Sequence, residues 1–164
     1  MSKKNFLNFR RNPTFRRKFF IFSLFAESPL IFLIEDTENN VFGCYINSKI
    51  DKYRYVENDI AKGVEDPNCF VFSYKDNKPN KYELRKDRKD NSIFMLYDKN
   101  DFRLFLLGER DIFIRKSNWK SSCIDDINEC KFDYQGKQKV INGKSGSNEE
   151  NFFEVKRILV IQMT

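Results

Sequence analysis

The residue types that enzymes use for acid–base and nucleophilic chemistry are sparse in this chain. Its 164 residues contain no histidine, which excludes a His general base, a Ser-His-Asp or Cys-His pair and a His-ligated metal. Of the four cysteines, Cys44 and Cys69 lie in apolar runs, so we expect buried thiols in a reducing environment. Cys123, with Lys120 nearby, is the remaining candidate nucleophile, but no histidine can serve as its base.

Two short motifs look like ligand sites but lack the required spacing. Gly143-Lys144-Ser145 resembles the end of a phosphate-binding loop, which needs a glycine where this chain has Gln138. Asp125-Asp126 is a pair of carboxylates, yet neighbours on an extended chain point to opposite sides, and no third acid lies at a calcium-loop offset. We interpret both as ordinary loops, and the residues predict no catalytic residue, no metal site and no cofactor.

The positive charge is concentrated at the N-terminus. The chain has a net charge of +6, but residues 1–18 carry seven basic side chains and no acidic one, which leaves 23 basic and 24 acidic side chains elsewhere. Because basic and acidic side chains nearly cancel in residues 19–164, the sequence does not favour a nucleic-acid-binding fold. The basic arm, residues 1–18, is itself suited to binding an anionic membrane surface or another polyanion. Its basic residues are Lys3, Lys4, Arg10, Arg11, Arg16, Arg17 and Lys18.

A phenylalanine-rich segment follows the basic arm. The apolar stretch from Phe19 to Ile34 has 16 residues and contains Glu27 and Pro29, whereas a membrane-spanning helix needs about 20 apolar residues. A signal peptide would need a small-residue cleavage site, which residues 24–27 do not supply. The remaining interpretations are a disordered arm before the first strand and a segment lying on an anionic membrane. We therefore separate residues 1–29 from a domain at 30–164.

The rest of the chain reads as short strands and turns. We expect strands at 30–34, 41–46, 69–74, 93–97, 103–107, 111–115 and 152–162, loops at 116–128 and 135–150, and a short helix or long loop at 51–66. The apolar run at 30–34 is typical of a strand buried on both faces. A turn at 36–40 would close a hairpin, and a second turn is expected at 76–80. Gly43 indicates a bulge or a close backbone approach. Regular short strands predict an antiparallel sandwich or barrel.

Four segments resemble, in order, the motifs of one family. Phe42-Gly43-Cys44-Tyr45 is similar to a Phe-Gly-Gly-Tyr strand, and Phe70-Val71-Phe72-Ser73 to a Phe-x-Phe-Ser strand. The Gly108 turn leads into a strand at Ile112, and the closing segment runs from Phe153 to Ile158. Together they resemble the TLDc domain, an intracellular domain linked to oxidative-stress resistance. The positions carried over, as structural ones, are Phe42, Gly43, Tyr45, Phe70, Phe72, Ser73, Gly108, Ile112, Phe153 and Ile158.

The resemblance covers about residues 30–164 and implies a mainly β fold, a sandwich of two antiparallel sheets with short flanking helices. Cys44 replaces the second glycine and Leu159 replaces an acid, so the chain is expected to be a divergent member whose opening part is missing or altered. The resemblance implies no catalytic residue and no cofactor. It implies a cytoplasmic, non-enzymatic protein-interaction module that binds the vacuolar proton ATPase. The alternative is a peripheral membrane or polyanion adaptor targeted by residues 1–29.

Overall fold

The computed structural model describes residues 6–10, 29–50, 64–75, 78–87, 94–97, 102–108, 110–116, 120–123, 130–135, 141 and 151–163. Within these ranges the chain forms eleven β-strands and no helix. The described ranges thus lack the short flanking helices that the family resemblance implied. Most of the segment expected to form a helix or a loop, residues 51–63, lies outside them.

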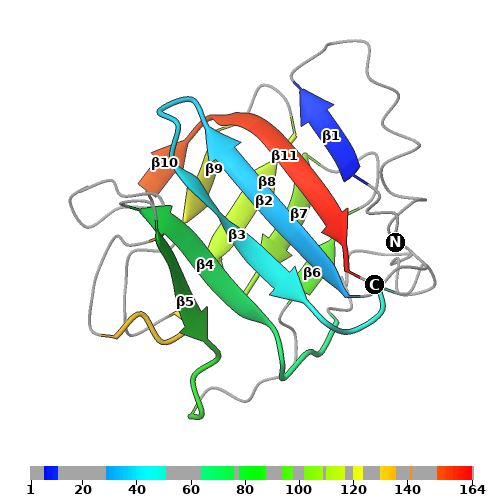
Figure 1. Ribbon diagram of the computed structural model, residues 1–164, viewed down its shortest axis with the longest axis vertical. Helices are drawn as coiled ribbons and strands as arrows, with labels where there is room; N and C mark the ends of the chain where they lie inside the picture. The colour runs from blue at the N-terminus through cyan, green and yellow to red at the C-terminus, as the bar shows by residue number, and fades with distance from the viewer. Residues whose placement is uncertain are drawn as a thin grey trace.

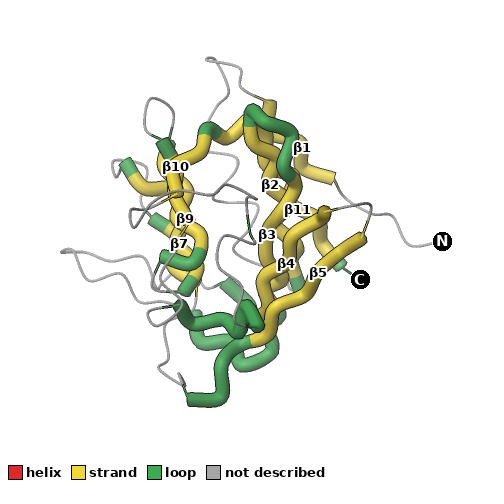
Figure 2. Tube along the Cα trace, turned by 90° about the vertical axis from the view of Figure 1, so that its left-hand side faces the viewer, coloured by secondary structure: helices red, strands yellow, loops and turns green. Residues whose placement is uncertain are grey.

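The strands form two antiparallel sheets that face each other, as Figures 1 and 2 show. The six-stranded sheet has the order β1 (Phe6–Arg10), β11 (Val155–Gln162), β2 (Leu30–Asp36), β3 (Val41–Ile46), β4 (Phe70–Lys75) and β5 (Lys78–Glu83). The five-stranded sheet has the order β10 (Asn151–Phe153), β9 (Ser121–Cys123), β8 (Ile112–Arg115), β7 (Arg103–Leu107) and β6 (Phe94–Leu96). This arrangement confirms the predicted two-sheet antiparallel sandwich.

Three local predictions need correction. The region expected to be a loop at 116–128 contains β9, whose short Ser-Ser-Cys sequence lacks the apolar run that normally marks a strand. The single closing strand expected at 152–162 is two strands in different sheets, separated at Glu154. The Glu154 carbonyl accepts a hydrogen bond from the Thr37 amide at 2.9 Å. Residues 78–80, expected to be part of a turn, belong to β5.

Aromatic side chains between the two sheets form the centre of the core. The ring of Phe32 on β2 lies 5.2 Å from the rings of Phe94 on β6 and Phe105 on β7, measured between centroids. Phe42 on β3 meets Phe153 on β10 edge to face at 5.0 Å. These five rings are at most 1% exposed. Burying one such side chain stabilises the fold by about 1.5–3 kcal/mol, so these contacts are a major link between the sheets.

One strand of the basic N-terminal segment is part of the sandwich. β1 pairs with β11 at the edge of the six-stranded sheet, with Arg10 opposite Arg157. The other basic residues expected to contact anions lie outside the described ranges, namely Lys3, Lys4, Arg11, Arg16, Arg17 and Lys18. Membrane or polyanion contact by this segment therefore stays a prediction. Among the described residues, no helix is long and apolar enough to cross a membrane.

Candidate functional site

The first two sequence motifs meet side by side on β3 and β4. Gly43 pairs with Phe72, and the Tyr45 ring stacks on the Phe70 ring at 4.9 Å with an interplanar angle of 16°. A Cβ atom at Gly43 would overlap the Phe32 carbonyl oxygen and lie 3.0 Å from Cζ of Phe72. Only glycine fits this position without displacing backbone. The structure confirms the predicted close backbone approach at Gly43.

The motif residues divide between the two faces of the sandwich. The residues directed into the core are Phe42, Ser73, Ile112, Phe153 and Ile158, all buried. The Ser73 hydroxyl lies 3.5 Å from the Tyr82 hydroxyl, so a buried polar pair sits among the apolar side chains. Tyr45, Phe70 and Phe72 alternate with buried neighbours and are half-buried on the opposite side of the sheet. The inward positions stabilise the fold, whereas the outward positions form a surface.

This outward surface of the six-stranded sheet is a regular grid. We call it the outer apolar face, and cross-strand register orders it in three rows. From β11 to β5 the rows are Ile161-Ile31-Tyr45-Phe70-Glu83, Leu159-Leu33-Gly43-Phe72-Lys81 and Arg157-Glu35-Val41-Tyr74-Pro79. The apolar side chains on β11, β2, β3 and β4 are half-buried except Tyr74, which is 49% exposed, and Pro79 on β5 is exposed as well. The prediction of burial on both faces at 30–34 is therefore wrong for Ile31 and Leu33, because no described element completes their burial.

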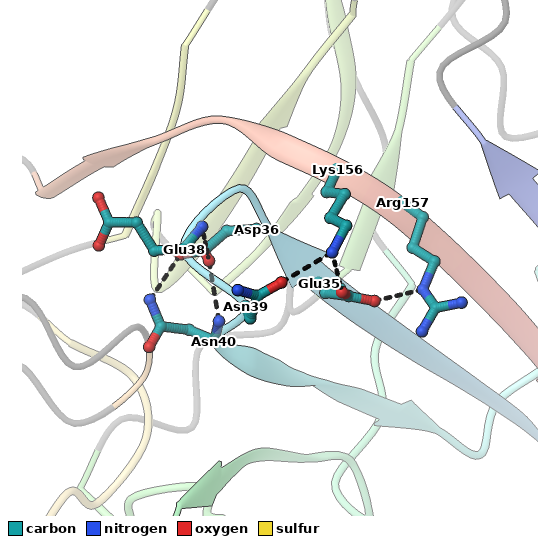
Figure 3. Close-up of polar contacts among 7 residues, drawn as sticks. All are labelled: Glu35, Asp36, Glu38, Asn39, Asn40, Lys156 and Arg157. Carbon is teal, nitrogen blue, oxygen red and sulfur yellow. Dashed lines mark hydrogen bonds and ion pairs between the residues drawn. The ribbon is translucent and has the colours of Figure 1, made fainter.

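Ion pairs lie at two corners of the outer apolar face. At the β5 corner, Lys81 Nζ lies 2.8 Å from Glu83 Oε1 and 4.6 Å from the centroid of Phe70. At the opposite corner, Glu35 accepts hydrogen bonds from Lys156, at 2.7 Å, and from Arg157, as Figure 3 shows. The Lys156 hydrogen bond lowers the pKa of Glu35, with a further lowering contribution from Arg157. The carboxylates of Glu35 and Glu83 are thus each paired with a neighbouring cation.

The β2–β3 hairpin beside Glu35 is held by a fully buried carboxylate. Asp36 Oδ1 accepts hydrogen bonds from the amides of Glu38 and Asn40 at 2.9 Å, and Asp36 Oδ2 accepts one from Asn40 Nδ2 at 2.8 Å (Figure 3). Aspartate satisfies turn amides in this way because its short side chain reaches the backbone two to four residues on. Asp36 is therefore a structural residue of the predicted turn.

Asp66 has the same role in a second loop. Its carboxylate is fully buried and accepts hydrogen bonds from the amides of Asn47, Ser48, at 2.9 Å, and Asn68, at 3.0 Å. The Ser48 hydroxyl also donates to the Glu65 carbonyl at 2.9 Å. These contacts join the end of β3 to the approach to β4. A carboxylate saturated by backbone donors is not available as a general base in this geometry.

The third buried carboxylate explains the Gly108 motif. Gly108 has φ of 61°, and a Cβ atom there would overlap the Asp111 carboxylate. Asp111 accepts hydrogen bonds from the Lys131 amide at 2.9 Å and from the Tyr134 hydroxyl at 2.7 Å. Burial raises the pKa of Asp111 to about 6, although these hydrogen bonds favour its charged form. Sequence reasoning missed this group, because Asp111 and Tyr134 are far apart in the chain.

The raised pKa of Asp111 predicts a pH-dependent stability. The folded chain binds the Asp111 proton more tightly than the unfolded chain, so the contribution is present at low pH and is lost as pH rises from about 4 to about 6. Relative to Asp111→Asn, the wild-type free energy of unfolding is expected to fall by about 3 kcal/mol over this range. Urea unfolding at a series of pH values measures the difference. Parallel pH profiles for the two proteins would contradict the prediction.

The described thiols are not placed for nucleophilic chemistry. Cys44, Cys69, Cys123 and Cys130 are all buried and free, which confirms the expectation for Cys44 and Cys69. Burial raises the pKa of the Cys44 and Cys69 thiols well above their ordinary value, so the reactive thiolate is disfavoured. Asp125, Asp126 and the Gly143-Lys144-Ser145 segment lie outside the described ranges. Among the residues that the structure describes, no group of three Cys, Asp or Glu side chains could hold a metal ion.

One open depression, with a volume of about 670 Å³, lies where β5 ends. It is lined by residues 83–87 on one side and by Phe132, Asp133 and Tyr134 on the other. Two backbone hydrogen bonds join the two lining segments, from Arg85 to Lys131 at 2.9 Å and from Asp133 to Glu83 at 2.8 Å. Its charged lining includes the Arg85–Asp87 ion pair, 2.9 Å between Nη2 and Oδ2. Tyr134 donates its hydroxyl to Asp111, so this tyrosine is committed to a structural hydrogen bond.

Fold and surface together define a two-sheet antiparallel β-sandwich whose buried carboxylates fix loops and whose outer face is apolar. A family model of the TLDc domain matches residues 14–158. The chain therefore belongs to the TLDc domain family, as its four motifs indicated. The match begins within the segment separated as residues 1–29. A search of curated proteins found no match.

Proposed function

We propose that this chain is a non-enzymatic, cytoplasmic protein-interaction module of the TLDc type. The observation that carries the proposal is the family match over residues 14–158. The chemistry of the described groups supports it: Asp36, Asp66 and Asp111 each accept several hydrogen bonds from loops, and the cysteines are buried. Carboxylates and thiols in such positions stabilise the fold. A stable fold with an apolar face is suited to binding another protein.

The partner that we propose is the vacuolar proton ATPase, and the role is protection against oxidative damage. Both follow from the family resemblance of the motifs on β3, β4, β8 and β11. The second candidate function is a peripheral membrane or polyanion adaptor. It is favoured by the seven basic and no acidic side chains of residues 1–18. Such binding would depend on those charges and weaken steeply with salt.

The two functions can be separated by quantitative capture with the full-length chain. The wild type and a variant with the six basic residues of 1–18 outside β1 changed to glutamine are immobilised and exposed to purified vacuolar proton ATPase or to phosphatidylserine vesicles, at low and moderate salt. We expect both proteins to retain the ATPase to the same extent, because β1 and the sandwich are unchanged. Salt-sensitive vesicle binding by the wild type alone, without ATPase capture, would instead support the adaptor. No capture of either probe would contradict both.

A further inference from the structure

We infer that the edge of β11 that faces away from β2, which we call the β11 edge, is a strand-binding site. In this chain β1 occupies it, antiparallel to β11 (Figure 1), and an extended segment of another protein, with two alternate apolar residues and an acidic residue, can take its place. This inference deepens the proposed function, because it names one surface of the interaction module and the chemistry of the segment that binds there. Sheet edges bind such segments through main-chain hydrogen bonds, and alternate side chains provide specificity.

The β11 edge does not depend on β1 for its position. β1 is the terminal strand of the six-stranded sheet, and β11 is its only neighbour in that sheet. β11 is held on its other side by β2, with which it pairs from Val155 to Gln162. The family match begins at residue 14, after β1. Removing β1 would therefore leave β11 in place, with a row of unpaired main-chain groups ready to accept another strand.

The connection of β1 to the rest of the sandwich makes it a displaceable occupant. β1 and β2 are not adjacent, because β11 lies between them, and residues 11–29 connect the two strands. This connection is longer than the loops of about two to five residues that join ordinary hairpins. A tethered segment competes at an effective concentration on the order of millimolar. A segment of another protein displaces it near that concentration, or at a lower one if it binds more tightly.

The strand register specifies two apolar residues in any occupant of the β11 edge. Ile158 and Val160 of β11 are at most 6% exposed and belong to the core between the sheets. In β1 the positions paired with them are Phe9 and Leu7. Because these positions alternate along the strand, an occupant needs an apolar residue, any residue and a second apolar residue in succession.

Charge at one end of the β11 edge favours an acidic residue in the occupant. Arg10 of β1 is the partner of Arg157, and like charges directly opposite each other destabilise an antiparallel pair. Arg157 and Lys156 share the carboxylate of Glu35 (Figure 3), so cations outnumber carboxylates among these described side chains. An acidic residue opposite Arg157 would remove the repulsion and add an attraction. A second copy of this chain would bring the same arginine, so a segment of another protein is the better occupant.

The test measures binding of fluorescent peptides by anisotropy. One peptide has the sequence of residues 5–11, and the other carries Arg10→Glu. They are added to the full-length wild type and to a full-length variant with Leu7→Pro and Asn8→Pro. Amide directions alternate along a strand, so one of two neighbouring prolines removes a hydrogen bond to β11. We expect this variant to bind both peptides at least ten-fold more tightly than the wild type does, and the glutamate peptide to bind at least two-fold more tightly than the native peptide.

Matched controls distinguish the β11 edge from the exposed apolar side chains elsewhere. Tyr74 on β4 is 49% exposed and Phe152 on β10 is 42% exposed. Tyr74→Glu and Phe152→Glu, each added to the double-proline variant, are expected to change peptide binding by less than two-fold. A peptide that contains both prolines is expected to bind at least ten-fold more weakly than the native peptide. Circular dichroism verifies that each variant folds.

Hydrogen exchange tests the inference even if the double-proline variant does not fold. In the wild type, the alternate amides of β11 that are directed to β1 are expected to exchange at least ten-fold faster than those directed to β2, because β1 leaves the edge more readily. Arg10→Glu in the full-length protein is expected to slow this exchange at least two-fold, since the acid then lies opposite Arg157. Equal exchange of the two sets of amides would overturn the inference.

The peptide experiments have equally clear contrary outcomes. No binding to a folded double-proline variant, equal binding to this variant and the wild type, or equal losses in the controls would overturn the inference. A wild-type dimer that the two prolines dissociate in sedimentation would overturn it in favour of strand exchange between copies. ATPase capture is scored separately. Capture without peptide binding overturns this inference alone, whereas peptide binding without capture retains the β11 edge and contradicts the proposed partner.

Discussion

Replacing Gly43 by alanine is expected to unfold this protein or to lower its free energy of unfolding by at least about 4 kcal/mol. The added methyl group would overlap the backbone carbonyl oxygen of Phe32 on the paired strand. Because β2 and β3 are central strands of the six-stranded sheet, neither can move away without breaking pairing on its other side. Native domains are stable by only about 5–15 kcal/mol. Chemical unfolding monitored by circular dichroism measures the loss.

Two controls identify the physical cause at Gly43. Val41→Ala, at the next outward position of the same strand, removes two methyl groups from a half-buried side chain and is expected to cost about 1 kcal/mol. Adding Phe72→Leu to Gly43→Ala is expected to restore little stability, because the overlapping atom belongs to the backbone and not to the Phe72 ring. Full rescue by Phe72→Leu would show that the ring, which is the movable neighbour, is the reason for the glycine. A Gly43→Ala protein as stable as wild type would rule out the close approach.

The second large effect concerns the aromatic contact that joins the sheets. Phe42→Ala is expected to lower the free energy of unfolding by about 3–5 kcal/mol, because it opens a cavity in a fully buried region. Phe153→Ala is expected to have a similar effect, since the two rings meet edge to face at 5.0 Å. In the double variant, the interaction energy is expected to be about 0.5–1.5 kcal/mol. Urea denaturation of the wild type, both single variants and the double variant yields these values.

The neighbour of Phe153 is the natural control for this cycle. Phe152 is 42% exposed on the opposite side of β10, so Phe152→Ala is expected to cost less than about 1 kcal/mol. If Phe152→Ala lowered the free energy of unfolding as much as Phe153→Ala, Phe152 would also have to be buried, which contradicts the inward and outward sides assigned to β10. Strict additivity of Phe42→Ala and Phe153→Ala would mean that the rings contribute only through burial.

Local sequence patterns were sufficient for the fold class and for the individual hairpins. The strands at 41–46 and 103–107 have the predicted bounds, because each is a short, mainly apolar run between polar segments. The Asp36–Asn40 turn was also predictable, since its Asp and Asn side chains satisfy the backbone within the turn itself. These are short-range interactions, so a few neighbouring residues determine them. The order of the four motifs likewise identified the family.

The tertiary structure decided what depends on contacts between distant segments. Alternate residues of β2 point to opposite sides of the sheet, and the second sheet covers only one of these sides. Because the run at 30–34 is apolar at every position, the sequence does not indicate which residues face the core. The separation of β10 from β11 at Glu154 depends on the position of each sheet. The buried Asp111–Tyr134 pair joins residues 23 positions apart. The periodicity of the sequence reflects the local geometry of the chain. Burial and strand register depend instead on the strand or sheet that packs against a segment, and the local sequence does not specify that partner.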